Sequence, residues 1–215
     1  MKLSYFISKL IKKLHIPAIK ESHIERTAKV CSGSHVFNIK LGKYSYIGNY
    51  CNVFNTQIGN YCSIADNCFI GGASHPMDWV STSPVFHKGK NIMKKNFSNR
   101  KYEVCKKTII GNDVWIGSGS QIKSGLKVGN GAVIGMGSVV TKDVGDFEIW
   151  AGNPARFIRK RFNDEVIIKL IESNWWNWDD EILYQMAPYF DNVDAFLENI
   201  KQRGEFFEST THMPS

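Results

Sequence analysis

The histidine best placed for chemistry is His75, in the segment Ser74-His-Pro-Met-Asp-Trp79. Imidazole changes charge near neutral pH, so it suits a general base that takes a proton from a hydroxyl group during attack. The alternative interpretation is an ordinary loop or packing histidine. The other histidines have no comparable sequence context: His15, His23, His35, His87 and His212.

Two other kinds of catalytic centre do not fit the sequence. No Gly-x-Ser-x-Gly segment is present, which argues against a Ser-His-Asp hydrolase. A zinc site needs several converging ligands, and no second histidine accompanies His75 at a suitable spacing. The five cysteines form no CxxC pair, which is typical of reduced, partly buried thiols. We therefore expect no metal.

Aliphatic residues recur at a fixed spacing along much of the chain. Downstream, six anchors follow one another at steps of six: Ile110, Ile116, Ile122, Val128, Ile134 and Val140. Upstream, eight anchors follow at steps of five or six: Val30, Val36, Leu41, Ile47, Val53, Ile58, Ile64 and Ile70. Glycine directly follows eight of these fourteen anchors.

A six-residue period fits neither an α-helix nor a simple hairpin. It fits a short strand followed by a tight corner, three of which close one triangular coil, with the anchors stacked inside. Glycine beside an anchor lets the chain turn where a Cβ atom would be crowded. The alternative fold is a β-sandwich, in which each turn would interrupt the six-residue spacing of the anchors. The pattern predicts an all-β solenoid.

Two segments leave the repeat. Residues 72–107 interrupt it as a long loop, and long loops in compact domains are usually functional. Beyond Gly152 the apolar spacing becomes helical, and a solenoid end is expected to carry a cap. We therefore predict three regions: an N-terminal segment 1–29, a β-helix core 30–152, and a C-terminal helical cap 153–215.

Residues 1–20 are basic and amphipathic. Leu3, Ile7, Leu10 and Leu14 share one helical face, whereas the lysines lie elsewhere. One interpretation is a helix that caps the first coil. The other is a helix that binds peripherally to a membrane surface.

Composition narrows the class of protein. Hydrophobic residues make up 43% of the chain and charged residues 22%, as in ordinary globular proteins. The net charge of +7 favours anionic partners, but no nucleic-acid-binding motif is present, so we expect no nucleic acid. No apolar run is long enough to span a membrane, and no secretory signal is evident. We expect a cytoplasmic protein, at the inner face of the membrane if residues 1–20 bind lipid.

The repeat, with its loop and three local motifs, resembles the hexapeptide-repeat acetyltransferases. The motifs are Ser74–Trp79, Asp113-Val-Trp-Ile-Gly117 and Trp175-Trp-Asn-Trp178, together with the segment Ala151–Arg156. They are similar to the xenobiotic acetyltransferase-like branch, which includes streptogramin and chloramphenicol acetyltransferases and polysaccharide O-acetyltransferases. The resemblance covers roughly residues 30–200. It implies a left-handed parallel β-helix, acetyl-CoA as co-substrate, and a homotrimer whose subunits share each active site.

The resemblance also implies roles for individual residues. His75 matches the general base, and the indole N–H of Trp115 would face the thioester, although a packing role is the alternative. The backbone at Gly117 and Ser118 would line the pantetheine arm. The other implied cofactor-binding residues are Met136, Thr141, Lys142, Arg156 and Arg159, the last three for the phosphates.

The acceptor side is less specific. The candidates from position are Tyr44, Asn55, Asp78 and Trp79, each with a structural role as the alternative. Residues 88–107 hold eight basic residues and one acid, which is either a solvated loop or a surface that attracts an anionic acceptor.

The function that we predict is O-acetylation of a sugar hydroxyl in a bacterial surface polysaccharide or its precursor. The alternatives are inactivation of a hydroxyl-bearing antibiotic and N-acetylation of an amino sugar. A noncatalytic trimeric scaffold belongs to a different class and would not bind acetyl-CoA.

Overall fold

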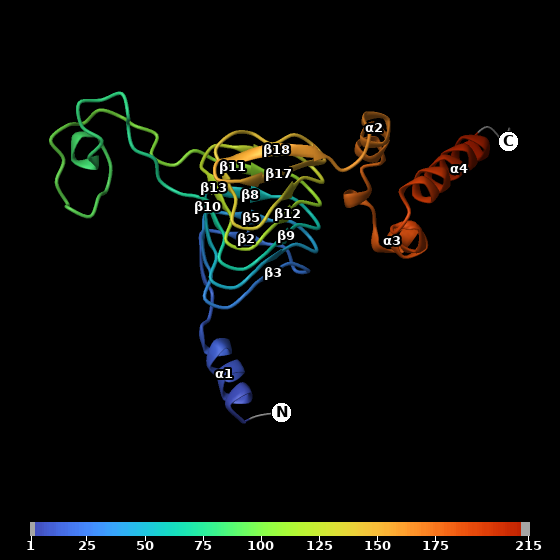
Figure 1. Cartoon of the computed structure of the whole chain (residues 1–215), viewed down its shortest axis with the longest axis horizontal. Helices are drawn as coiled ribbons and strands as arrows, with labels where there is room; N and C mark the ends of the chain where they lie inside the picture. Colours follow the sequence, from blue (N-terminus) through green and yellow to red (C-terminus); the bar gives the residue numbers. More distant parts are fainter. Residues whose placement is uncertain (1–2, 212–215) are drawn as a thin grey trace. The chain divides into compact units, whose positions relative to one another are not determined.

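The computed structural model describes residues 3–211, and the chain divides into two units between Lys160 and Arg161. The first unit is a stack of coils made of short parallel strands, from which the segment 72–107 projects (Figure 1). The second unit is helical. Each unit is described by itself.

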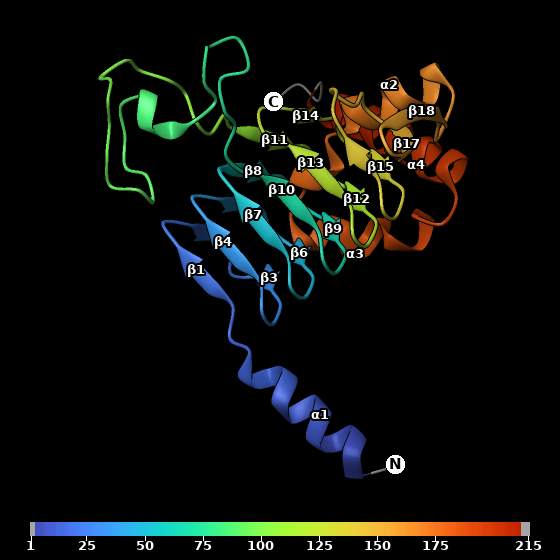
Figure 2. The ribbon, with the colours of Figure 1, turned by 60° about the vertical axis from the view of Figure 1, so that its left-hand side comes forward.

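Three sheets form the walls of the solenoid (Figure 2). Sheet A contains β1 (Ala18–Lys20), β4 (His35–Phe37), β7 (Asn52–Phe54), β10 (Phe69–Gly71), β13 (Gln121–Lys123) and β16 (Val139–Val140). Sheet B contains β2 (His23–Ile24), β5 (Lys40–Leu41), β8 (Thr56–Ile58), β11 (Thr108–Ile110) and β14 (Lys127–Val128). Sheet C contains β3 (Lys29–Val30), β6 (Tyr46–Ile47), β9 (Ser63–Ile64), β12 (Trp115–Ile116), β15 (Val133–Ile134), β17 (Glu148–Gly152) and β18 (Ala155–Lys160).

The chain visits sheets A, B and C in turn, which confirms the predicted parallel β-helix. Thirteen of the fourteen predicted anchors are buried. They stack in register: in sheet C, Ile47 pairs with Ile64, Ile64 with Ile116, and Ile116 with Ile134. Val30 is the half-buried exception, because the first coil has a neighbour on one side only.

Both predicted boundaries of the β-helix are displaced. Its first coil begins at Ala18, since β1, β2 and β3 pair in register with the second coil. Its last strand ends at Lys160, in a hairpin of β17 with the antiparallel β18. The expected limits at 29/30 and 152/153 therefore fall inside the solenoid. End strands pack against one neighbour, so they do not need the strict aliphatic spacing.

A ladder of side-chain amides holds the corner between sheets B and C. The Oδ1 atom of Asn60 accepts from the backbone N–H of Lys43 at 2.9 Å, and Asn112 does the same for Asn60 at 2.8 Å. A Cβ atom on Gly59 would lie 2.5 Å from the Oδ1 atom of Asn112. Glycine after the anchor is therefore required by this ladder, because coils approach one another closely here.

Three of the five cysteines are core residues. All five are free, and Cys51, Cys62 and Cys68 are buried. Burial raises the pKa of the Cys62 thiol to about 12, so the thiol stays protonated and unreactive.

Helix α1 (Leu3–Leu14) precedes the first coil. Every side chain described in it is exposed, so the helix does not cover the coil as a cap. No helix within residues 3–211 is long and apolar enough to cross a membrane.

The second unit confirms the predicted C-terminal helices: α2 (Asp164–Ser173), α3 (Asp180–Met186) and α4 (Val193–Thr211). The Asn163 side chain caps α2 by accepting from the backbone N–H of Val166. Trp175 and Phe196 are buried in this unit, and the exposed Phe190 ring lies edge-on to them at 5.1 Å and 5.0 Å. That these helices cover the solenoid end stays a prediction.

We expect Ile64→Ala to lower the free energy of unfolding by about 2–5 kcal/mol, because it leaves a cavity in the anchor stack. Ile109 offers a matched control: it is 38% exposed, whereas Ile64 is fully buried. Ile109→Ala should cost about 1 kcal/mol or less. Urea unfolding of both variants measures the difference, and equal losses would contradict the anchor role.

Candidate active site

The segment 72–107, here called the excursion, leaves the solenoid after β10 and returns at β11, at the corner between sheets A and B. Hydrogen bonds join its two limbs near this root. The Ser74 backbone N–H donates to the Val104 carbonyl at 2.6 Å, and the Ser74 hydroxyl donates to the same oxygen at 3.1 Å. The position of the residue that follows Ser74 is thereby fixed.

Asn55 supports the root from the coil below. Its Nδ2 atom donates to the Cys105 carbonyl at 2.8 Å, and its carbonyl accepts from the Thr108 backbone N–H at 3.0 Å. Asn55 has a φ of 47°, a conformation that asparagine tolerates better than most residues. Its contacts in the chain are therefore structural, and a role in acceptor binding stays a prediction.

His75 follows Ser74 directly and is exposed. Its Nδ1 atom lies 2.8 Å from the carbonyl oxygen of Thr82. A carbonyl oxygen only accepts, so Nδ1 carries the proton and Nε2 of the neutral ring keeps a lone pair. This tautomer leaves Nε2 able to accept a proton.

The far part of the excursion has its own small core. The Trp79 ring lies edge-on to Tyr102 at 5.7 Å and to His87 at 6.5 Å, and the Arg100 guanidinium lies 5.5 Å from its centre. His87 is only 4% exposed, and no sequence signal indicated its burial. Trp79 thus packs inside the excursion, whereas Asp78 is exposed beside it.

The eight basic residues of the excursion form its charged surface. All of them are exposed: Lys88, Lys90, Lys94, Lys95, Arg100, Lys101, Lys106 and Lys107. Lys107 reaches back to the solenoid, where its Nζ atom donates to the Gln57 side chain at 3.0 Å. The basic surface therefore continues onto sheet B.

Trp115 lies on sheet C and points outward, with 55% of its surface exposed. In the sheet it pairs with Ser63 on one side and Val133 on the other. Gly117 and Ser118 follow at the corner between sheets C and A. A Cβ atom on Gly117 would lie 2.5 Å from the Met136 backbone nitrogen, so the coils approach closely there.

The residues expected to hold phosphates are divided between two sides of the solenoid. Arg156 and Arg159 lie on β18 of sheet C, opposite Ala151 and Ile149. Each guanidinium donates to a backbone carbonyl, and both side chains are exposed. Thr141 and Lys142 are exposed as well, but they follow β16 of sheet A, on the corner that carries the excursion.

In a triangular solenoid, the corner between sheets A and B lies opposite sheet C. Figure 1 shows the excursion on one side of the coils and the sheet C strands β9 and β12 on the other. The chain thus separates His75 from Trp115. Apart from Tyr44, the predicted site residues fall into two groups, here called the partial sites: one at the A–B corner and one on sheet C with its adjoining corner.

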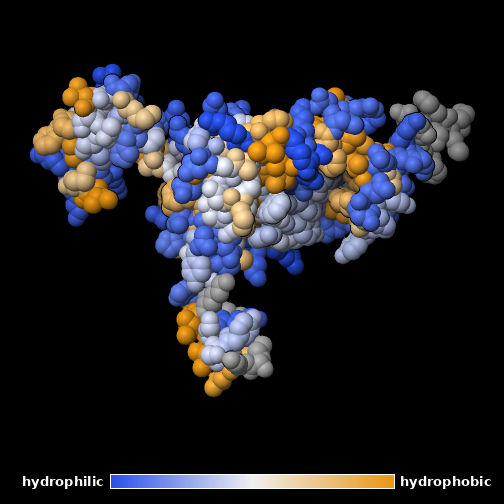
Figure 3. Space-filling model, viewed as in Figure 1, coloured by the Kyte–Doolittle hydropathy of each residue, from blue (hydrophilic) through white to orange (hydrophobic). Residues whose placement is uncertain are grey.

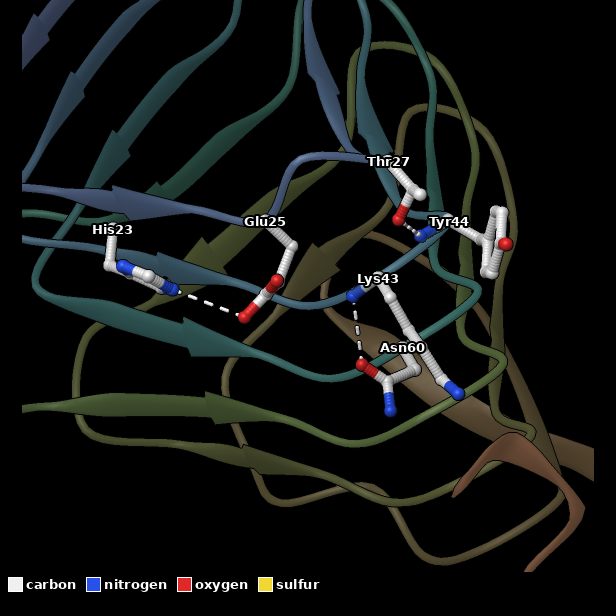
Figure 4. Close-up of polar contacts among 6 residues, drawn as sticks. All are labelled: His23, Glu25, Thr27, Lys43, Tyr44 and Asn60. Carbon is white, nitrogen blue, oxygen red and sulfur yellow. Dashed lines mark hydrogen bonds and ion pairs between the residues drawn. The ribbon is translucent and has the colours of Figure 1, made fainter. Parts of the chain in front are cut away.

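Tyr44 belongs to neither partial site. It lies at the corner between sheets B and C, where its ring stacks on Tyr61 at a centroid distance of 5.2 Å. Its backbone N–H donates to the Thr27 hydroxyl at 3.1 Å (Figure 4). Its role in acceptor binding stays a prediction.

A polar groove of about 630 Å³ runs along sheet B near this corner. In this groove, Nε2 of the exposed His23 lies 3.1 Å from the Glu25 carboxylate (Figure 4). Lys40 and Lys43 also line the groove and contribute positive charge. Among the residues that the structure describes, no three His, Cys, Asp or Glu side chains are grouped to bind a metal.

Comparisons with known proteins identify relatives of this chain. A model of the bacterial transferase hexapeptide (six repeats) matches residues 107–142. The chloramphenicol acetyltransferase of Agrobacterium fabrum is 40% identical over 170 residues, which cover 70% of this chain and 81% of that protein. A probable macrolide acetyltransferase of Lysinibacillus sphaericus is 38% identical over 125 residues, covering 58% of this chain and 66% of that protein.

A solved structure shares the fold. It is that of a serine-to-alanine mutant of AntD, an N-acyltransferase from Bacillus cereus, in complex with dTDP-4-amino-4,6-dideoxyglucose and coenzyme A. The TM-score is 0.52 at 19% identity, and the match covers 79% of this chain and 96% of that one.

The two hydrogen bonds of Asn55 predict that Asn55→Asp loosens the excursion, because it removes the donor to Cys105 and adds a charge. We expect faster cleavage within residues 72–107 in limited proteolysis. Asn67→Asp is the control, since Asn67 has a similar φ of 61° at another corner. Unchanged cleavage with a raised acceptor KM would instead assign Asn55 to acceptor binding.

Proposed function

Because the chain belongs to the hexapeptide-repeat acetyltransferases, whose fold is a left-handed parallel β-helix, we propose that it acetylates a hydroxyl group directly from acetyl-CoA. The single observation that carries this mechanism is the 2.8 Å contact between Nδ1 of His75 and the Thr82 carbonyl oxygen. Its Nδ1–H donates to Thr82, so Nε2 is free to act as general base. No covalent enzyme intermediate is needed, because the thioester is already activated.

The proton balance of the reaction runs through His75. As the acceptor oxygen attacks the thioester carbon, its proton moves to Nε2, and the ring is then a cation held by the Thr82 carbonyl. When the carbon–sulfur bond breaks, the same proton leaves with the thiolate sulfur. The indole N–H of Trp115 donates to the oxygen that gains charge in between.

The two partial sites favour a homotrimer with shared active sites. A single shallow face of the solenoid can form only one wall of a coenzyme channel. Within one chain, the A–B corner lies opposite sheet C and cannot form the second wall. In a cyclic trimer, the A–B corner of one subunit can face sheet C of the next, which joins His75 with Trp115 across the interface. Each of the three interfaces then holds one site.

Sheet C and its adjoining corner would hold coenzyme A. Gly117 and Ser118 offer backbone groups to the pantetheine arm, with Met136 beside them on the next coil. Arg156 and Arg159 are exposed cations that suit the phosphates. Thr141 and Lys142 would complete the pocket from the neighbouring subunit, because they lie on its A–B corner.

For the acceptor, we propose a hydroxyl of an anionic saccharide, such as a bacterial surface polysaccharide or its precursor. Eight exposed cations on the excursion, the segment that also carries His75, support this choice. The second candidate is a hydroxyl-bearing antibiotic, which is favoured by the 40% identity with a chloramphenicol acetyltransferase. Steady-state assays with acetyl-CoA and each acceptor class separate the two candidates.

His75→Ala should lower kcat by about 10²–10⁴, the usual contribution of a general base, and leave acetyl-CoA affinity nearly unchanged. His35→Ala is the matched control, because His35 is also exposed but lies on sheet A. A thiol-release assay measures kcat, and calorimetry measures binding. Wild-type turnover in His75→Ala would remove His75 from the mechanism.

Co-expression tests the shared site. His75→Ala and Trp115→Ala chains should each be nearly inactive alone. In a random mixture, roughly a quarter of the interfaces would combine an intact His75 with an intact Trp115, so about a quarter of wild-type activity should return. Activity that stays at the level of the single variants, or a fully active monomer in light scattering, would contradict the trimer.

The anionic acceptor predicts salt dependence. Raising salt from about 50 to 300 mM should lower kcat/KM for the acceptor, because screening weakens attraction to the excursion. Changing Lys88, Lys90 and Lys101 to Gln should reproduce most of that loss at low salt. In the control variant, Lys29, Lys123 and Lys127 are changed to Gln. These substitutions remove the same amount of charge from strands of the solenoid. Efficient, salt-independent turnover of a neutral acceptor would favour the antibiotic instead.

A further inference from the structure

Helix α1 presents an apolar face that no other residue described by the structure covers. Leu3, Phe6, Leu10 and Leu14 share this face at helical spacing, and their exposed fractions run from 61% to 78%. Figure 3 shows the apolar atoms gathered along one side of this helix. Such a stripe of large side chains marks an interaction surface.

In the part of the chain that the structure describes, the helix joins the solenoid at its C-terminal end. There His15 accepts from the Gly33 backbone N–H through its carbonyl, and its ring lies 3.1 Å from the Tyr50 hydroxyl. Pro17 then precedes the first strand. The connection fixes the root of α1 and leaves its apolar face outward.

The charge of this segment selects the partner. Residues 1–20 contain five lysines and neither Asp nor Glu. The Nζ atom of Lys9 lies over the Tyr5 ring at 5.9 Å, away from the apolar face. A bundle of α1 helices from several copies would gather these positive charges without a partner acid, whereas an anionic surface would neutralise them.

We infer that α1 binds in the surface of an anionic lipid bilayer, with its apolar face in the acyl boundary and its lysines at the headgroups. At 12 residues the helix is about 18 Å long, shorter than the roughly 30 Å hydrocarbon core, so it lies on the membrane and does not cross it. This inference concerns where the protein binds in the cell, and it does not depend on which acceptor the enzyme acetylates.

Vesicle binding by the full chain tests the inference. The protein should sediment with vesicles of phosphatidylglycerol and phosphatidylcholine, less in high salt, and not with phosphatidylcholine alone. Leu10→Ala with Leu14→Ala should lower the partition coefficient roughly tenfold or more. Tyr5→Ala, on the opposite face, is the matched control and should change it little.

Three outcomes would overturn the inference: no binding of the wild-type chain to anionic vesicles, equal binding by the Leu10/Leu14 double variant, or a changed oligomeric state of that variant in light scattering without vesicles. The last result would show that α1 packs against a second copy. Acetyl transfer to a soluble acceptor should be unchanged in the double variant. Because vesicle binding needs no turnover, a failure of the proposed function would leave this readout intact.

Discussion

The stacking of one buried aliphatic side chain per strand is the interaction on which the rest of this structure depends. Each anchor packs on the anchors of the coils above and below, as Ile64 packs between Ile47 and Ile116. Backbone hydrogen bonds between coils are then evenly spaced, and the corners fall at fixed places. A residue's place in the period decides whether it points inward, outward or along a corner.

Because the coils are regular, the solenoid holds its corners and its three sheets at fixed, separate positions. An insertion at a corner costs little packing, because the anchors on either side, Ile70 and Ile110, remain buried. The excursion therefore projects freely and holds His75 at its root. The same geometry keeps His75 away from sheet C of its own chain. Oligomerisation is then the direct way to build a closed site from convex parts.

Charge is concentrated on the parts that project from the solenoid. Both α1 and the excursion are basic, and Lys9 of α1 and the eight cations of the excursion are exposed. Both segments also expose large apolar side chains, among them Val80, Ile92 and Phe97 in the excursion and Leu3, Leu10 and Leu14 in α1. In α1 the apolar side chains share one helical face, and such a face beside lysines suits a lipid headgroup layer.

The sequence by itself determined the solenoid, since its anchor period is local and repeats often enough to exclude other folds. It also indicated His75, because the surrounding motif and the break in the period coincide. It could not determine the ends of the β-helix, where strands with one neighbour tolerate exposed residues such as Ala18. Only the tertiary structure decided that Asn55 bonds the excursion's return limb and that His75 and Trp115 lie apart. These facts depend on which coil and which of three sheets a residue occupies, and local spacing does not carry that information.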